Sequence, residues 1–536
     1  MPRFAPADLR AGRLHFLLDL TWGGSVYRLA ESAVSATIGA EVVEYADGLD
    51  FAGSWEDRID LFATSPSGRS VSLTMHLTAL VDVPSVVSRG LSLGSARGVL
   101  SLWLEGTTEL HTVIAGALRG VRYGSKEEPV TATLEELPLR SPGLLPSSLQ
   151  RVKAPAEFDP LAPSVLDQYY PIVFGRPGGP DGYGSPALFH DVFVGFTSSV
   201  TVAAHACVGG TVKIINDDSG ATETAAVAVE TDGNYTGPGI IRTAVDLTSL
   251  PATAADADKP HFVQWTAGNA GGLPSKADPS VPMRGAGEIL AWLLERSGAR
   301  VDTGRTAAAV TLLDAYRLDA AIVPGKDKRV SPLAWATEHI IPILPVSMRV
   351  GDDGLYPVVW RFDATKADAV ATLSADEIQA ARVGDVEYSE SDALYQAIRF
   401  DYGLDYREDT YQYTLTYTGD AAAAATDAAI VLDPGLQSSF VQYAAGSAEQ
   451  MRTFELSSDV VLETSTAHLV CRYLARRYGR LTRLVRYEVD PEFAWLEPGD
   501  VVTITDRELA LSSAVATVET VVWTAEESVG LGLRIL

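Results

Sequence analysis

Hydrophobic residues alternate one by one with other residues in segments spread along the whole chain. The clearest of these segments are Leu14–Leu20, Val71–Leu77, Tyr411–Tyr417 and Val529–Ile535. Successive side chains of a β-strand point to opposite faces of the sheet, so this alternation is the period of a strand with one buried face. The chain is therefore expected to be mainly β, with strands from its first residues to its last.

Turn residues separate the predicted strands of the first half of the chain. Gly23-Gly24 precedes the segment 25–30 and predicts a tight hairpin. Further strands are predicted at 99–106, 129–137, 211–217 and 224–237. A stretch rich in proline and serine, 139–164, has little periodicity and indicates a boundary. We expect one β-rich domain at 1–150 and a second at 151–282.

From residue 283 the pattern changes to a helical period, and the region 283–385 is expected to be α+β. Apolar residues between 289 and 294 lie on one helical face, and Gly298 is expected to end that helix. A second helix is predicted at 306–318. A third, at 331–342, would have Ser331 as its cap, Pro332 at its first position and Pro342 at its end.

The region 386–536 is expected to be a C-terminal β domain with one helix at 465–478. Thr464 or Ser465 can cap this helix, and Gly479 can end it. The alanine-rich stretch 418–429 is of low complexity and predicts an exposed loop or linker. This C-terminal domain is expected to pair with the N-terminal one.

Composition limits what such a chain can bind. Its 536 residues are enough for roughly three to five domains. With 69 acidic and 42 basic residues, its net charge is −27. A surface of this kind repels nucleic acid and anionic membranes, which argues against general DNA or RNA binding. It is compatible with the wall of a channel through which a polyanion passes without being retained.

Two cysteines, Cys207 and Cys471, lie far apart in the sequence and form no CxxC motif. A disulfide framework and a cysteine zinc site are therefore not expected. Asp19 interrupts the apolar patch near the start, so no signal peptide is expected, and no run of about 18 apolar residues predicts a membrane span.

Motifs of known chemistry are weak or missing. The glycine-rich stretch 175–184 has neither the Lys-Ser/Thr of a phosphate-binding loop nor a GxGxxG spacing. The eight histidines form no HxH or HExxH pattern, and there is no GxSxG nucleophile motif. We therefore expect no enzyme activity, no catalytic residues, no cofactor and no bound metal.

The segment Trp495–Asp506 places three acids, Glu497, Asp500 and Asp506, around a Pro-Gly turn. Pro498 fits the second position of a type II turn and Gly499 the third, which needs a positive φ, so Pro498, Gly499 and Asp500 predict a structural turn into a strand. Two alternatives stay open. Glu497 and Asp500 could share a calcium ion. Asp490 and Glu492 could form a sugar-cleaving carboxylate pair, with Trp495 as a sugar platform.

A local basic stripe stands out in this acidic chain. Its arginines lie on or just after the predicted C-terminal helix; they are Arg472, Arg476, Arg477, Arg480, Arg483 and Arg486. One interpretation is a solvated face paired with nearby carboxylates. The other is a docking surface for an acidic partner subunit, including a second copy of this chain.

Four motifs in a fixed order resemble the hub or tail-tip proteins of long-tailed bacteriophages. They are the strand region 117–137 with its "YG", the "PIVFG" entry within 169–179, the helix of 284–302 followed by Val-Asp, and the "LxPGDxVxI" segment Leu496–Ile504 after an arginine-bearing helix. "PGD" turns are common in β proteins, so the shared order carries the resemblance.

The resemblance implies a multi-domain baseplate hub made of β-barrel domains with an α+β insertion. Such hubs form ring-shaped homotrimers at the tail tip of the virion and are assembled in the host cytoplasm. The implied partners are the distal tail protein or tail tube, the tape measure protein, and a tail fibre or receptor-binding tip protein, with DNA present only in transit. The resemblance implies that the hub gates DNA ejection; it supplies no catalytic residues. The alternative is a tail protein that binds carbohydrate or cleaves peptidoglycan.

Overall fold

A computed structural model gives the fold of the chain. It describes residues 13–50, 55–58, 70–77, 92–108, 110–123, 129–136, 143–147, 169–177, 190–194, 199–216, 220–232, 240–246, 261–265, 271–322, 329–351, 354–374, 378–388, 394–405, 408–436, 452–479, 482–489, 493, 495–524 and 528–536. Most of the predicted boundary at 139–164 lies outside these residues.

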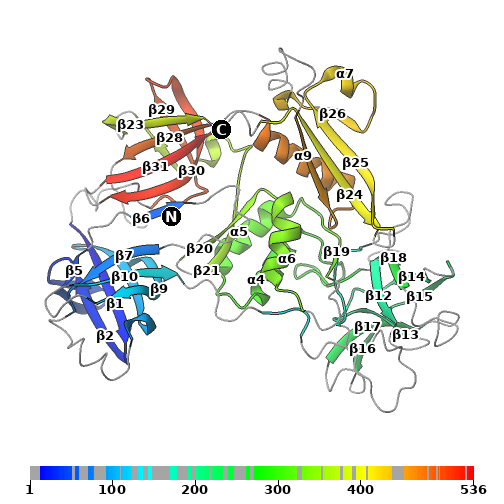
Figure 1. The fold of residues 1–536 in the computed structure, drawn as a ribbon, viewed down its shortest axis with the longest axis horizontal. Helices are drawn as coiled ribbons and strands as arrows, with labels where there is room; N and C mark the ends of the chain where they lie inside the picture. Colours follow the sequence, from blue (N-terminus) through cyan, green and yellow to red (C-terminus); the bar gives the residue numbers. More distant parts are fainter. Residues whose placement is uncertain are drawn as a thin grey trace.

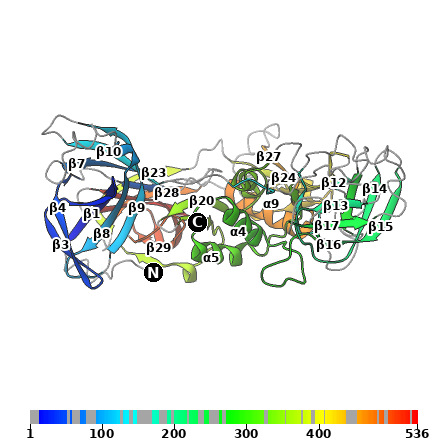
Figure 2. The same cartoon turned by 90° about the horizontal axis from the view of Figure 1, so that it is seen from below.

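The described residues form a mainly β protein with several sheets and few helices, which confirms the expected class. Figure 1 shows the sheets of the two chain ends, blue and red, next to each other. Helices α4, α5 and α6 lie in the centre, and the sheet that contains β12 to β18 lies at the opposite end; Figure 2 shows the same order from below.

The N-terminal sheet has the strand order β3-β4-β2-β1-β8-β9-β10-β7-β5. Its strands are β1 Leu14–Trp22, β2 Ser25–Ala30, β3 Val34–Ile38, β4 Glu41–Asp47, β5 Leu49–Asp50, β7 Ser70–Met75, β8 Arg97–Leu104, β9 Leu110–Arg122 and β10 Val130–Glu136. The predicted hairpin between β1 and β2 is confirmed: Gly23 (φ 59°) and Gly24 (φ 87°) form a two-residue loop with the positive φ values of a type I′ turn.

One segment of chain reaches both ends of this sheet. β4 pairs in parallel with β2, next to the outer strand β3, and β5 pairs antiparallel with β7 as the outer strand at the other end; only Gly48 separates β4 from β5. The amide of Gly48 donates to the carbonyl of Ala30 (3.1 Å), and the amide of His76 donates to the carbonyl of Gly48 (2.7 Å). An added Cβ at Gly48 would lie 2.8 Å from the His76 carbonyl oxygen, so the change of partner strand requires glycine.

A second sheet has a similar arrangement at its ends. Its order is β15-β14-β18-β12-β13-β17-β16. The strands are β12 His190–Val194, β13 Ser199–Ala203, β14 Thr211–Asn216, β15 Thr222–Ala226, β16 Ala228–Asp232, β17 Ile240–Asp246 and β18 His261–Trp265. The outer strands β15 and β16 are separated only by Val227, which packs against a core that includes Val212, Val263 and Trp265.

The C-terminal sheet has the order β22-β29-β30-β31-β28-β23. The strands are β22 Ala371–Leu373, β23 Ile378–Tyr388, β28 Arg483–Val489, β29 Val501–Asp506, β30 Leu511–Thr524 and β31 Ser528–Ile535. β6, Trp55–Arg58, comes from the N-terminal part of the chain and pairs antiparallel with β30.

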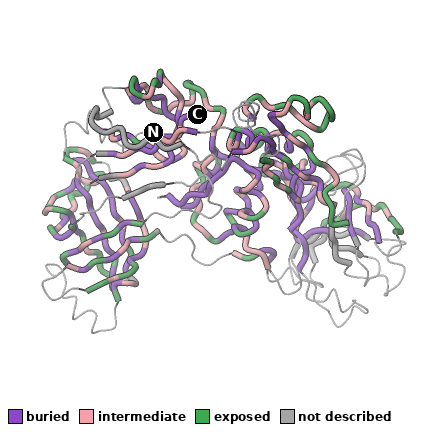
Figure 3. Tube along the Cα trace, turned by 45° about the horizontal axis from the view of Figure 1, so that its top comes forward, coloured by how far each residue is buried: buried purple, intermediate pink, exposed green. Residues whose placement is uncertain are grey.

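The two terminal sheets share one hydrophobic core. Leu18, Leu73 and Leu134 of the first sheet and Val485 and Leu531 of the last belong to the same buried cluster. Burying apolar surface contributes roughly 25 cal/mol per Å², so a continuous core couples the two ends of the chain strongly. Figure 3 shows buried residues in both sheets and in the central helices.

The central region is α+β. Its elements are α4 Ala286–Arg296, α5 Thr303–Leu313, α6 Pro332–Trp335, a π-helical turn Ala336–Ile340, the 3-10 turns Ile341–Ile343 and Lys366–Asp368, the pair β11 Ile172–Phe174 and β19 Ala320–Ile322, and the hairpin β20 Val346–Gly351 and β21 Gly354–Val359. The cap at Ser331, Pro332 at the first helical position and the stop at Gly298 (φ 80°) are confirmed.

A four-stranded sheet completes the fold, with the order β26-β25-β24-β27. Its strands are β24 Ala397–Asp405, β25 Thr410–Thr418, β26 Ile430–Leu432 and β27 Thr453–Ser458, and helix α9 Thr464–Tyr478 lies against it. A further 3-10 turn, Leu93–Ser95, precedes β8 of the N-terminal sheet.

One local prediction for this region was confirmed in part and another was wrong. The stretch 418–429 is mostly exposed after residue 420, as expected, but it contains a one-turn helix, α7 Ala421–Ala424, whose first turn is capped by the Asp420 side chain, which accepts a hydrogen bond from the Ala422 amide (2.8 Å). Helix α9 is preceded by Glu463 as its N-cap, without a side-chain cap, rather than by Thr464 or Ser465. The Thr464 hydroxyl instead contacts the Tyr402 hydroxyl (3.1 Å).

Candidate functional site at the proline-glycine turn

The turn at 497–500 joins the loop before β29 to the C-terminal sheet. The Asp500 amide donates to the Glu497 carbonyl (3.0 Å), which closes a four-residue turn. Gly499 has φ +99° at the third position, where a type II turn needs a positive φ. The Gly499 amide donates to the Val518 carbonyl (2.7 Å) and the Val518 amide to the Asp500 carbonyl (2.8 Å), so the turn is tied to β30.

The same turn packs against the central α+β region. An added Cβ at Gly499 would lie 2.3 Å from Cγ1 of Val358 on β21. This close approach leaves no room for a side chain, and the sequence alone does not reveal it. The turn is therefore a contact between two regions of the chain as well as the start of a strand.

Glu497 carries the main polar contact between these regions. Its Oε1 lies 2.8 Å from Nη2 of Arg305 on α5, and its Oε2 lies 3.7 Å from Nη1 of Arg349 on β20. The Arg349 side chain is only 1% exposed. Arg305 also donates to the Tyr356 hydroxyl (2.6 Å) and lies over the Tyr356 ring. We call Glu497, Asp500, Arg305, Arg349 and Tyr356 the joint.

Asp500 is the second carboxylate of the joint. Its Oδ2 accepts from the Glu497 amide at 2.8 Å. Burial raises the pKa of Asp500 from 3.8 to about 6, and the nearby charge of Glu497 adds to this, whereas the hydrogen bond from the Glu497 amide and the charges of Arg349 and Arg305 oppose it. The joint therefore exchanges a proton close to neutral pH.

Asp506, the third acid of the segment, lies apart from the other two. It is buried and accepts a hydrogen bond from the Tyr487 hydroxyl (2.7 Å) on β28. Its Oδ1 also accepts from the Glu508 amide (2.8 Å). The three acids thus divide into a pair in the joint and one within the C-terminal sheet.

Glu497 and Asp500, the residues of the alternative calcium site, do lie together in the joint, where Glu497 faces Arg305 and Arg349. Within the described part of the chain, no group of three or more His, Cys, Asp or Glu side chains could hold a metal ion. Asp490 and Glu492 lie outside the described residues. Trp495 is partly buried against the core shared by the terminal sheets.

The described arginines of the predicted basic stripe lie on two different elements and have different neighbours. Arg472 and Arg476 are exposed on α9, and Arg476 lies 3.9 Å from Asp363. Arg477 instead lies over the ring of Tyr478, with its guanidinium 4.9 Å from the ring centre. Arg483 and Arg486 belong to β28 in another sheet, and Arg480 lies outside the described residues. Only Arg472 and Arg476 therefore remain as neighbours on the exposed face of the helix.

His339 forms an ion pair that sequence reasoning missed. Its Nδ1 lies 2.9 Å from Asp459, a residue 120 positions away. The hydrogen bond and charge of Asp459 raise the pKa of His339 above 6.5, against the opposing effect of burial. No local signal could have revealed the pair, because Asp459 follows β27, in the four-stranded sheet.

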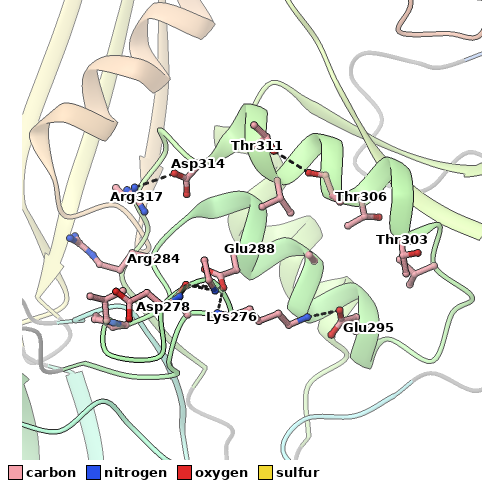
Figure 4. Close-up of a pocket in the computed structure, with 18 residues that line it drawn as sticks. Lys276, Asp278, Arg284, Glu288, Glu295, Thr303, Thr306, Thr311, Asp314 and Arg317 are labelled. Carbon is pink, nitrogen blue, oxygen red and sulfur yellow. Dashed lines mark hydrogen bonds and ion pairs between the residues drawn. The ribbon is translucent and has the colours of Figure 1, made fainter. Parts of the chain in front are cut away.

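A groove lies beside the joint, between α4, α5 and the loop 275–282 (Figure 4). Its volume is about 650 Å³. Ala291, Val310, Val281 and Pro282 line it together with charged and hydroxyl side chains, some of which are labelled in the figure. No part of the sequence pattern predicted this groove.

Among the described residues, no helix is both long and apolar enough to cross a bilayer. No protein-family model matches the chain. No curated protein matches it either.

Several solved structures are similar to this chain at low TM-scores. The tail protein from Neisseria meningitidis MC58 has 10% identity and a TM-score of 0.37, over 97% of this chain and 96% of that one. The 43 kDa tail protein of prophage MuSo2 from Shewanella oneidensis has 8% identity and a TM-score of 0.36, over 97% and 98%. A chain from the virion of a native gene transfer agent particle has 13% identity and a TM-score of 0.38, over 72% and 89%. The chain is distantly similar in structure to two tail proteins, one of them from a prophage, and to a virion component.

Proposed function

We propose that this chain is a structural tail protein of a phage or phage-like particle, and within it the hub that caps the distal end of the tail tube. The observation that carries the proposal is the order of four sequence motifs, which ends with an arginine-bearing helix, a strand and the segment Leu496–Ile504. In this role the hub joins the distal tail ring to tip or fibre proteins and gates DNA ejection.

The fold has features of a rigid structural component. The first and last sheets share one core, and β6 pairs directly with β30, so the chain ends are held together. The segments 41–50 and 222–232 each contribute strands at or next to both ends of one sheet, and we propose that the β domains close into barrels in this way. We further propose domains at 1–150, 151–282, 283–385 and 386–536.

The net charge supports the proposed position around a DNA channel. At −27 the chain would not retain DNA that passes through a ring of several copies, because like charges repel. In this proposal the chain is a homotrimer of the tail tip, assembled in the host cytoplasm, and contacts the tail tube or distal tail protein, the tape measure protein and a fibre or tip protein.

Cryo-electron microscopy of particles from the encoding strain, with the chain tagged at an exposed loop, tests the proposal. We expect density for the tag at the distal end of the tail, in a ring of three copies. Label on the head, or absence of the chain from purified tails, would refute a structural role there. A purified monomer that cleaves peptidoglycan would favour the alternative tail enzyme instead.

A further inference from the structure

The groove between α4, α5 and the loop 275–282 is built with fixed walls. Glu288 of α4 accepts hydrogen bonds from the Lys276 amide and from the Ser275 hydroxyl (3.1 Å), which fastens the loop to the helix. Lys276 reaches Glu295 at 2.5 Å and closes one end. Because these contacts attach the loop at two points along α4, the groove exists before any ligand arrives.

The floor of the groove is made of small apolar side chains. Ala291 of α4, Ala307 and Val310 of α5, and Val281 and Pro282 of the loop line it. Helix α4 approaches α5 closely at Gly287, where an added Cβ would lie 2.5 Å from the Val310 backbone. Small side chains on a floor allow another backbone to approach closely, as at helix–helix contacts.

A buried hydroxyl on this floor lacks a partner. Thr306 lines the groove and is 5% exposed. Its Oγ1 makes no hydrogen bond to any described residue. This oxygen is itself shielded from solvent, so a ligand in the groove does not reach it unless its neighbours shift.

The rim of the groove is acidic. Asp278, Glu288, Glu295 and Asp314 face Lys276, Arg284 and Arg317. Arg284 is already neutralised from outside the groove by Asp319 (2.6 Å) and Glu463 (2.7 Å), and Arg317 is paired with Asp314 (3.3 Å). Lys276 is paired with Glu295 in the same way (2.5 Å), so Asp278 and Glu288 leave the rim with a negative charge, which is complementary to a cation on an apolar stem.

We propose that this groove is the docking site of a lysine- or arginine-bearing segment of a partner protein. Such a segment lays small apolar side chains on the floor and places its cations against the acidic rim. The inference goes beyond the proposed function and stands or falls separately, because it concerns the purified chain.

The test measures binding of two labelled peptides to the full-length chain by fluorescence anisotropy. Both are alanine-based and about 15 residues long, long enough to form a helix; one carries lysines and the other carries glutamates at the same positions. We expect the lysine peptide to bind more tightly by roughly tenfold or more, with an affinity that falls as salt is added.

Two neighbouring alanines of α5 give matched variants. Ala307 and Ala308 are both exposed on α5, but only Ala307 lines the groove. Ala307→Arg should weaken binding of the lysine peptide by about tenfold or more, because it blocks the floor and adds a like charge, whereas Ala308→Arg should change it by less than about twofold. Equal effects of the two changes would overturn the proposal, as would equal binding of the two peptides.

Two further measurements use the unmodified chain, so their results do not depend on whether the variants fold. Carbodiimide cross-linking of the bound lysine peptide to the unmodified chain, followed by mass spectrometry, should join it to Glu295, Asp314 or Asp278; cross-links confined to other acids would contradict the site. Spermidine serves as a competitor. If spermidine at equal charge displaces the peptide and binds equally well, the groove is a polyamine site and not a protein-docking surface.

Discussion

The joint and the exposed arginines of α9 use the same pairing, an arginine with a carboxylate, in two different environments. In the joint, Glu497 meets Arg305 and the buried Arg349 at the contact between the C-terminal sheet and the central region. On α9, Arg476 faces Asp363 at 3.9 Å, and the two side chains are 42% and 65% exposed. Water screens the second pair more than the first, in which Arg349 is buried and Glu497 is 21% exposed, so the joint is expected to influence stability more strongly.

Removing Glu497 should have the largest effect. Glu497→Ala takes a carboxylate away from the buried Arg349 and from Arg305; because Glu497 and Arg305 are partly exposed, the cost should lie below the value of about 3–5 kcal/mol for a fully buried ion pair. We expect the thermal transition that includes the C-terminal sheet to shift down by several degrees in differential scanning calorimetry. Glu338→Ala is the control, since Glu338 is 77% exposed and its ion-pair contact with His339 is long at 3.9 Å. Equal shifts in melting temperature for the two variants would show that the ion pairs of the joint contribute no more to stability than an exposed pair does.

Asp500→Asn should be stabilising at neutral pH and neutral in acid. The pKa of Asp500 is raised from 3.8 to about 6, so the folded chain holds the proton more tightly than the unfolded chain does. Its contribution to stability is complete below about pH 4, declines as the pH rises to about 6, and above that leaves a deficit of about 2–3 kcal/mol. Asparagine keeps an acceptor for the Glu497 amide without the charge.

Thermal melts of this variant and of the unmodified chain from pH 4 to pH 8 check the sign. The difference in melting temperature should be close to zero at pH 4 and should favour Asp500→Asn above pH 6. A difference that is constant across this range would mean that the charge of Asp500 is not what matters.

Gly499→Ala tests the contact rather than the charge of the joint. A methyl group at φ +99° and 2.3 Å from Val358 should destabilise the chain by about 1–3 kcal/mol. The double variant with Val358→Ala should recover part of this loss, because it removes the obstructing methyl groups. Gly39→Ala is the matched control: Gly39 has φ +60° but nothing within 4 Å of an added Cβ, so only the backbone cost of about 1 kcal/mol should appear. These values can be compared by urea unfolding followed through tryptophan fluorescence.

Arg476→Ala should have the smallest effect. An exposed pair at 3.9 Å contributes about 0–1 kcal/mol, so we expect a change in melting temperature within the error of the measurement. A large loss of stability would mean that the exposed edge of α9 is a structural contact after all, and the comparison with the joint would fail.

The strand and helix patterns were readable from the sequence because local rules govern them. The alternation at Val71–Leu77 became β7 with alternating burial up to Met75, and the two glycines 23 and 24 formed the tight hairpin. Ser331 capped its helix as expected. The predicted N-cap of α9 was wrong because the Thr464 hydroxyl forms a hydrogen bond with the hydroxyl of Tyr402, which is distant in the sequence.

The mainly β class, the Pro498-Gly499 turn and the excess of acidic charge can be read from the sequence, since they follow from side-chain period, backbone dihedral preference and charge count. The folded chain is needed to see that Glu497 meets Arg305 and Arg349, that Arg472 and Arg476 lie apart from Arg483 and Arg486, and that α4 and α5 border a groove. These contacts join residues up to 192 positions apart. Local sequence patterns do not specify such contacts. The path of the folded chain sets which residues come together and how far each side chain is shielded from water.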